Sequence, residues 1–263
     1  MTDMGILLLT SASGAPGVTT LGVGLALTWP RSVLLADCDP GAHQAVLAGY
    51  LAGTSAEGKG LLRVAEAHRD RRALTEVVID QSVPLVEDEM VSRLFLPGFG
   101  RPTSAALFAG VWPDLTDAFT ALDDHGFDVI VDAGRISHSG LPSALVERAS
   151  LTAVVLRSDL RSVVSARVHL LALREHPRLE AHQRSLGLVV VGPGQPYTAR
   201  EIGKSLGAPV VAEISHDPVM AKHLSDGEPQ PRKFDGSRLV RSLHAAAGQL
   251  AARVNRADEL VRG

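Results

Sequence analysis

The segment Ser11-Ala12-Ser13-Gly14-Ala15-Pro16-Gly17-Val18-Thr19-Thr20 decides how the rest of this sequence is interpreted. It follows the apolar run at 6–9 and precedes a helix-like segment from Leu21 to Trp29. A glycine-containing loop between a strand and a helix is the context that a phosphate-binding loop of the pattern G-x-x-x-x-G-K-[ST] requires. The segment therefore predicts a P-loop, although it departs from that pattern at important positions.

The loop retains the backbone features that bind phosphate but lacks the charged side chain of the pattern. Val18 occupies the lysine position, and Ala12 occupies the position of the first glycine. Backbone N–H groups at a helix N-terminus still favour an anion, and Gly17 permits a tight turn. The hydroxyl of Thr19 can bind Mg²⁺. No neighbour replaces the lysine, because the first lysine of the chain is Lys59. The alternative is a strand-to-helix turn that only looks like a P-loop.

Two further apolar segments end in aspartate. The segment 32–37 leads into Asp37-Cys38-Asp39-Pro40, and the segment 127–132 ends at Asp132. Ligands of doubly wound α/β proteins bind at the carboxyl ends of the strands, where these carboxylates are expected. A single aspartate there is compatible with a solvated turn, but three motifs in this order are less readily explained by chance.

In this order the motifs resemble those of the ParA/MinD family of P-loop ATPases, which position chromosomes, plasmids, division sites and pili. Residues 13–20 lie on the family's K-G-G-x-G-K-T-T loop, and 37–40 match its D-x-D-P motif. The strand ending at Asp132 matches the family's Walker B strand. The resemblance extends over nearly the whole chain, through 153–159, 186–191 and 206–214.

The resemblance implies a site for ATP or ADP with Mg²⁺. The residues that it places around the phosphates are Ser13, Gly14, Ala15, Pro16, Gly17, Val18, Thr19 and Thr20. It gives Asp37, Asp39 and Asp132 the catalytic role of ordering Mg²⁺ and the attacking water. The metal ligands that it implies are Thr19, Asp37 and Asp132.

The departures from the family pattern bear on hydrolysis. The family's signature lysine falls on Ser13, its ordinary P-loop lysine on Val18, and its adenine-reading asparagine near Gly192. Phosphoryl transfer depends almost wholly on positioning and on stabilisation of charge, so the loss of a cationic group slows it strongly. We therefore expect weak or no ATP hydrolysis, whereas nucleotide binding is only weakened.

Two arginines are candidates to replace the missing cation. Arg135 follows the strand that ends at Asp132, and Arg157 follows the next strand. Arginine is a strong bidentate ligand of phosphate, so both count as cofactor-binding candidates. The alternative is that they are ordinary surface arginines, since only four of the 26 basic residues are lysines.

Strand-like and helix-like segments alternate, which predicts an α/β, doubly wound, mostly parallel sheet of about seven to eight strands with helices on both faces. Strands are expected at 5–11, 32–37, 92–97, 127–132, 152–157, 186–192 and 209–214. Helices are expected at 18–28, 41–51, 60–69, 104–124, 140–148, 160–175, 197–206 and 236–260. Residues 77–79 form a candidate extra strand, and the stretch from Pro84 to Glu89 is interpreted as a loop.

The chain is interpreted as one domain, 1–263, with 236–260 as a C-terminal helix. The helix has an apolar stripe that we expect to pack on the sheet or across a dimer, with a membrane surface as the alternative.

A net charge of −3 argues against a broadly basic protein for nucleic acid. The only cysteine, Cys38, excludes a disulfide framework and favours the cytoplasm. The ten histidines lack zinc-site spacing.

These observations favour a homodimeric protein that responds to nucleotide, or is constitutively dimeric, and regulates or positions a cytoplasmic assembly. Its protein partner would belong to a partition, division, pilus or secretion system. DNA or a membrane surface stays open as an additional partner, although the net charge does not indicate it. Such a partner would place the protein at the nucleoid or at the membrane. Two alternatives stay open: an active ATPase that uses arginine in place of lysine, and a scaffold that binds no nucleotide.

Overall fold

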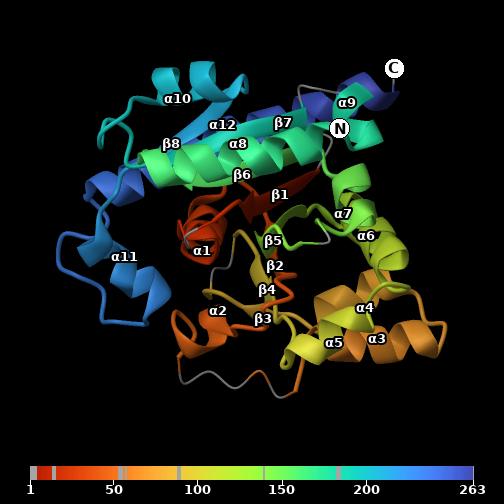
Figure 1. Cartoon of the computed structure of the whole chain (residues 1–263). Helices are drawn as coiled ribbons and strands as arrows, with labels where there is room; N and C mark the ends of the chain where they lie inside the picture. The colour runs from red at the N-terminus through yellow and green to blue at the C-terminus, as the bar shows by residue number, and fades with distance from the viewer. Residues whose placement is uncertain are drawn as a thin grey trace.

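The computed structural model describes residues 5–13, 16–52, 56, 58–87, 90–138, 140–181 and 185–262, with the side chains as far as residue 255. Its centre is an eight-stranded sheet in the order β3-β4-β2-β5-β1-β6-β7-β8. Neighbouring strands are parallel except β3 and β4, which are antiparallel. Helices cover both faces of the sheet (Figure 1). The predicted α/β, doubly wound fold is confirmed.

The strands are β1 (Ile6–Ser11), β2 (Val33–Asp37), β3 (Val83–Pro84), β4 (Arg93–Leu96), β5 (Asp128–Arg135), β6 (Leu151–Arg157), β7 (Leu186–Val191) and β8 (Val210–Ile214). The first helices are α1 (Val18–Thr28), α2 (Ala45–Ala48), α3 (Leu61–Arg69), α4 (Leu74–Asp80), α5 (Pro102–Ala106) and α6 (Trp112–Ala121), with the 3₁₀ helix η1 (Leu122–His125). The others are α7 (Ser143–Arg148), α8 (Leu160–Arg174), α9 (Pro177–Ala181), α10 (Ala199–Leu206), α11 (Pro218–Ser225) and α12 (Arg238–Arg262).

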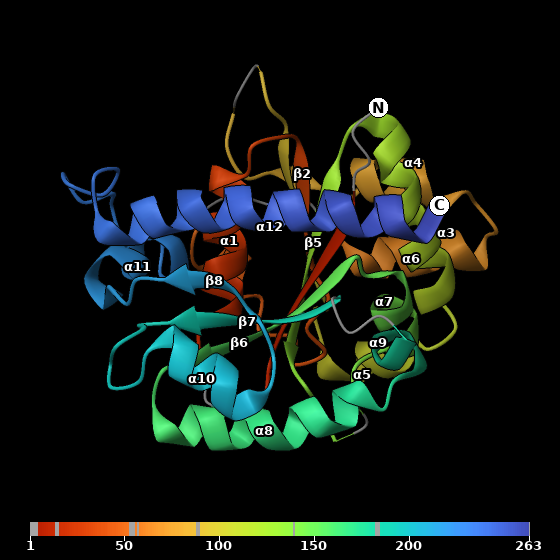
Figure 2. The same cartoon turned by 90° about the horizontal axis from the view of Figure 1, so that it is seen from above.

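The central strands are apolar on both faces, because each face is covered by helices. In β1, Leu7 and Leu9 join one core and Ile6 and Leu8 join the other. The first core contains buried residues of α1, α11 and α12, and the second those of α3, α4, α6, α7, α8 and α10. Continuous apolar runs are what a parallel strand buried on both faces requires. In Figure 2, α12 and α8 lie on opposite sides of β6, β7 and β8.

The C-terminal helix α12 packs on the protein's own sheet. Leu239, Leu243, Leu250 and Val254 are buried in the core that α12 shares with α1 and β8. The helix begins at Arg238, two residues after the predicted start. No helix in the described part of the chain has the length and the apolar character needed to cross a membrane.

Several predicted elements differ from the structure. Residues 77–79 are not a strand but part of α4, where Leu74, Val77 and Val78 have the spacing of one buried helical face. Pro84, expected in a loop, belongs to the short edge strand β3. The predicted helix at 41–51 is reduced to α2, because Ala42 and Gln44 have positive φ angles of 54° and 52°.

The long helix predicted at 104–124 is divided into α5, α6 and η1. The division falls at 107–111, and α6 then begins at Trp112 with Pro113 in its first turn. Proline is favoured in the first turn of a helix, because N–H groups there have no acceptor within the helix and the missing N–H of proline costs nothing. The helices α9 and α11 were not expected from the sequence.

A buried carboxylate ties together the end of the sheet remote from the predicted ligand edge. Asp128, fully buried at the start of β5, accepts hydrogen bonds from Trp29 Nε1 at 2.6 Å and from the Gly5 N–H at 3.1 Å. Arg31 Nη2 donates to Asp128 at 2.6 Å and to Asn255 Oδ1 at 2.6 Å. This network joins the residues before β1, the end of α1, the start of β2 and α12.

We expect Asp128→Ala to lower the free energy of unfolding by about 3 kcal/mol or more, measured by urea denaturation. The substitution leaves the Arg31 charge and the Trp29 N–H without their acceptor in a buried region. The resulting loss of stability is larger than the net stabilisation that the intact ion pair provides. Asp124→Ala, at an exposed position nearby, is the control and should change stability by less than about 0.5 kcal/mol. Equal effects of the two variants would contradict a structural role for the network.

Candidate functional site

The predicted P-loop leads into α1 through a glycine in the left-handed conformation. Gly17 has φ 94° and ψ 40°, and the helix has no side-chain cap at this end. The Leu21 N–H donates to the Gly17 carbonyl at 2.8 Å, which is the first hydrogen bond of the helix. The N–H groups of Val18, Thr19 and Thr20 precede that bond, so they have no acceptor within α1. Such a helix start favours an anion.

The side chain of Thr19 is bonded to the strand aspartate that the sequence singled out. Thr19 Oγ1 donates to Asp132 Oδ2 at 2.6 Å, and the Gly134 N–H donates to Asp132 Oδ1 at 2.9 Å. Asp132 is 2% exposed. Because β2 and β5 pair in parallel, Asp37 lies opposite Asp132 in the sheet. The structure therefore brings together Thr19, Asp37 and Asp132, which are 18 or more residues apart in sequence.

The third aspartate belongs to the same cluster. The Asp39 N–H donates to Asp37 Oδ1 at 3.1 Å, and Asp39 Oδ1 accepts from the Gly41 N–H at 2.8 Å. His43 Nε2 is 3.9 Å from Asp39 Oδ2, but the His43 side chain is 73% exposed. The three carboxyl groups are thus close enough to act on one another electrostatically, with little opposing positive charge from this neighbour.

Two glycines that the sequence analysis missed make room for these carboxylates. A Cβ atom on Gly98 would lie 2.5 Å from Asp37 Cγ, and one on Gly134 would lie 2.2 Å from Asp39 Cγ. Gly134 also has a φ angle of 60°. A larger residue at either position would displace a carboxylate. The signal in the sequence is that Gly98 directly follows the strand predicted at 92–97 and Gly134 follows the one predicted at 127–132 after one residue.

Burial and mutual repulsion disfavour the charged forms of two carboxyl groups. Burial, followed by the charges of Asp132 and Asp39, raises the pKa of Asp37 to about 8. Burial raises the pKa of Asp132 to about 6, although its bonds from Thr19 and Gly134 act in the opposite direction. A cation at this position would relieve the repulsion and favour both ionised forms.

The donor atoms suit Mg²⁺, which prefers carboxylate and hydroxyl oxygens. Within the ranges that the structure describes, no three or more His, Cys, Asp and Glu side chains form a ready-made metal cluster. This agrees with the usual coordination of Mg²⁺ in phosphate sites, where one or two carboxylates act with phosphate and water oxygens. Thr19, Asp37 and Asp132 are therefore the residues that would hold the ion.

The neighbouring thiol is inert. Cys38 is 1% exposed, and its N–H donates to the Asp132 carbonyl at 2.8 Å. Burial, together with the charge of Asp37, raises the pKa of the Cys38 thiol well above its usual value. A thiol in this environment stays protonated and contributes packing rather than reactivity.

The raised carboxyl pKa values predict a pH dependence of stability. Both folded-state pKa values exceed the unfolded value near 4, so the folded state binds more protons between about pH 4 and pH 8. Stability of the metal-free protein should therefore decrease as pH rises through this interval. Asp37→Asn should remove most of the decrease and be more stable than the parent at pH 8, because the amide cannot ionise. Urea denaturation at pH 5, 6, 7 and 8 measures this.

The control for the pH series is Asp124→Asn, which changes an exposed carboxyl and should retain the decrease. A parent-like slope in Asp37→Asn would show that this carboxyl is not perturbed.

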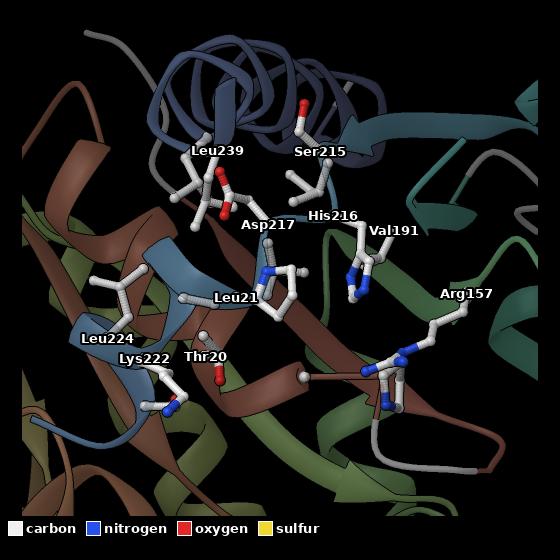
Figure 3. A pocket seen from close by; sticks show the side chains of 17 residues that line it. Thr20, Leu21, Arg157, Val191, Ser215, His216, Asp217, Lys222, Leu224 and Leu239 are labelled. Carbon is white, nitrogen blue, oxygen red and sulfur yellow. The ribbon is translucent and has the colours of Figure 1, made fainter. Parts of the chain in front are cut away.

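A cavity of about 360 Å³ opens on the other side of the loop, beyond β1 from the carboxylates (Figure 3). Its walls come from the loop, the start of α1, the ends of β6, β7 and β8, and the helices α11 and α12. The residues around it are Pro16, Gly17, Thr20, Leu21, Arg157, Val191, Ile214, Ser215, His216, Asp217, Pro218, Ala221, Lys222, Leu224, Ser225, Leu239 and Leu243.

The remaining predicted site residues lie in different surroundings. Arg157 lines the cavity, whereas Arg135, the exposed last residue of β5, does not. Val18, at the lysine position, is buried at 7% exposure in the core shared with α12. Ser13 is half-buried at the end of the described part of the loop. Gly14 and Ala15 lie outside the described residues.

Two basic cavity residues were missed by the sequence analysis. His216 follows β8, and Lys222 belongs to α11, whose start is capped by Asp217 accepting from the Met220 N–H at 3.1 Å. The signal available in the sequence was His216-Asp217-Pro218, a helix-start pattern directly after a predicted strand. This pattern predicts a helix, but it does not predict that the helix packs beside the loop.

The fold is that of known ATPases of the ParA and MinD type. The ParA family ATPase from Chlorobium tepidum TLS superposes with a TM-score of 0.74 at 18% identity, over 95% of this chain and 100% of that one. MinD from Pyrococcus horikoshii OT3, complexed with Mg-ADP, gives 0.63 at 16% identity over 94% and 96%. A Cyanothece McdA–ATP complex gives 0.68 at 14% identity over 95% and 97%.

Identities this low establish the fold rather than the activity. No protein-family model matches the sequence. No curated protein is significantly similar to it. The chain thus has the ParA/MinD-like fold over about 95% of its length, and its biochemical role has to be argued from its own residues.

Proposed function

We propose that this chain is a ParA/MinD-like nucleotide-binding protein with weak or no ATP hydrolysis, which positions or regulates a cellular assembly. The observation that carries the proposal is the hydrogen bond of 2.6 Å between Thr19 and Asp132, beside Asp37 and at the start of α1. A hydroxyl at a helix start, bonded to one of two carboxyl groups that lie opposite each other on neighbouring strands, is the arrangement that a phosphate–Mg²⁺ site needs.

The residues divide the binding between them. The N–H groups of Val18, Thr19 and Thr20 would bind phosphate oxygens at the positive end of α1. Thr19, Asp37 and Asp132 would hold Mg²⁺, with Asp39 orienting water. When bound, Mg²⁺ supplies positive charge to the phosphates. The raised pKa values of Asp37 and Asp132 imply that ion binding releases protons, because the ligands must ionise.

Val18 supports the expectation of slow hydrolysis. Its side chain is buried in the apolar core and provides no positive charge for the transferred phosphoryl group. One well-placed donor or cation at such a group typically contributes about 10²–10³ in rate. Binding depends less on this charge, because the backbone donors and the metal ligands remain.

We expect calorimetric titration to detect Mg-ADP and Mg-ATP at micromolar concentrations, on the order of the affinities common for enzyme ligands. Thr19→Ala and Asp132→Ala should each weaken binding at least about tenfold, because each removes one oxygen from the Mg²⁺ site. Asp124→Ala is the control for an exposed carboxyl. Phosphate release measured on the same samples should not exceed the uncatalysed background.

Two other results would select the alternatives. Absence of heat and of a thermal shift at millimolar nucleotide would make the protein a scaffold that keeps the fold for its surface. Sustained phosphate release would make it an active ATPase, and Arg157→Ala and Arg135→Ala would then identify the arginine responsible. Arg157 is favoured in that case because it alone of the two lines the cavity.

An exposed apolar stripe on α8 supports a protein contact, and we assign it to a homodimer. Leu160, Val164, Val168 and Leu171 are 60%, 53%, 64% and 59% exposed. Their spacing puts them on one face of the helix. Contiguous exposed apolar side chains of this kind mark interaction sites in soluble proteins. The helix lies on the outside of the molecule, away from α12 (Figure 2).

Sedimentation equilibrium of the parent protein, with and without Mg-ADP, should therefore show a dimer. The double variant Val164→Asp/Val168→Asp should be monomeric, because burying two carboxylates in an apolar contact is unfavourable. Val219→Asp, at a valine that is 65% exposed on α11, is the matched control and should remain dimeric. A parent protein that is monomeric under all conditions would rule out the homodimer and leave the stripe to a different protein.

A further inference from the structure

The two sides of the P-loop carry opposite charge. On the side of β2 and β5 lie the carboxylates of Asp37, Asp39 and Asp132. The basic side chain identified beside them is His43, whose Nε2 is 3.9 Å from Asp39 Oδ2 and whose side chain is 73% exposed, while the lysine position is occupied by Val18. A terminal phosphate placed here would meet negative charge that only a bound cation can offset.

On the side of β6, β7 and β8, the cavity is lined by Arg157, Lys222 and His216. Figure 3 shows Arg157 and His216 on one flank and Lys222 on the opposite flank. The one acidic side chain among the described lining residues is Asp217, and its Oδ1 already accepts the Met220 N–H. The cavity therefore presents donors and positive charge next to Gly17 and the first turn of α1.

Both cationic side chains are available to a ligand. Lys222 Nζ is 3.1 Å from Glu228 Oε1, but the two side chains are 54% and 51% exposed. An exposed pair of this kind is weak and exchanges readily. Arg157 is exposed, and its charge is only a minor cause of the lowered pKa of Asp159, which chiefly reflects the Ser162 N–H.

The interior of the cavity is apolar. Leu21, Val191, Ile214, Leu224 and Leu239 contribute to its walls, and the volume of about 360 Å³ is within the range of small-ligand sites. An apolar hollow with cations at its border suits a nucleoside whose first phosphate emerges toward the loop. Thr20, on the cavity wall at the start of α1, lies where that phosphate would meet the helix.

We propose that the site is specific for nucleoside monophosphates and diphosphates, and that Arg157 and Lys222 bind the phosphate nearest the nucleoside. Without a bound metal ion, a third phosphate gains no affinity, because it extends toward Asp37, Asp39 and Asp132 with no lysine to receive it. The inference rests on the proposed nucleotide-binding function and names the ligand class of that site. It makes Lys222, a residue outside the P-loop, a second cation of the site beside Arg157.

The test is calorimetric titration with AMP, ADP and ATP, each with and without Mg²⁺. Without Mg²⁺, AMP and ADP should bind at least as tightly as ATP. Lys222→Gln and Arg157→Gln should each weaken AMP and ADP about tenfold, as expected for loss of a charge-assisted bond. Lys233→Gln and Arg200→Gln, at exposed positions away from the cavity, are the matched controls.

Glu228→Gln is a variant for which the proposal predicts a gain in affinity instead of a loss. It frees Lys222 from its exposed partner and should tighten AMP binding about twofold to threefold. ATP that binds tenfold tighter than both ADP and AMP without Mg²⁺ would overturn the specificity while leaving nucleotide binding intact. Unchanged affinities in Lys222→Gln, Arg157→Gln and Glu228→Gln would overturn the assignment of the cations. Absence of binding by all three nucleotides would overturn this inference and the proposed function together.

Discussion

The parallel pairing of β5 with β1 on one side and β2 on the other is the constraint on which the site depends. The pairing with β2 sets Asp37 opposite Asp132, and the pairing with β1 brings the start of α1 to the same edge. Thr19 then reaches Asp132 with a hydrogen bond of 2.6 Å. Because side chains alternate along a strand, a shift of one residue in either register would turn Asp132 away from this edge. The apolar residues of β1 and β5, buried on both faces, make such a shift costly.

Strand β5 carries two buried aspartates with opposite energetic consequences. Asp128 is neutralised by Arg31 and receives further hydrogen bonds from Trp29 and Gly5, so its charge is compensated. Asp132 accepts hydrogen bonds from Thr19 and Gly134, but no arginine or lysine in the described part of the chain forms an ion pair with it, and its pKa rises to about 6. A buried charge without compensation costs stability, and this cost is commonly found where a protein binds a cation or a substrate. The contacts of Asp128 at one end of β5 thus stabilise the fold, whereas the burial of Asp132 next to Asp37 toward the other end destabilises it.

The loop divides the ligand edge into two environments. Carboxylates occupy the side of β2 and β5, and an apolar cavity bordered by Arg157 and Lys222 occupies the side of β6 to β8. The proteins that share the fold include one complexed with Mg-ADP and one with ATP. In the present chain the residue at the lysine position is the buried, apolar Val18, so no side-chain charge is supplied there, between the two environments.

The sequence by itself determined the strand–loop–helix order, most of the strands and the positions of the strand-end aspartates, because these depend on local hydrophobic runs and turn residues. It also identified Val18 at the lysine position. Only the tertiary structure decided that Val77 and Val78 lie in a helix, since a short apolar run suits either element until its packing is known. Likewise, Arg135 and Arg157 both end strands, but only Arg157 reaches the cavity. The contribution of Lys222 depends on how α11 packs against α1, a contact between segments some 200 residues apart that no local pattern encodes.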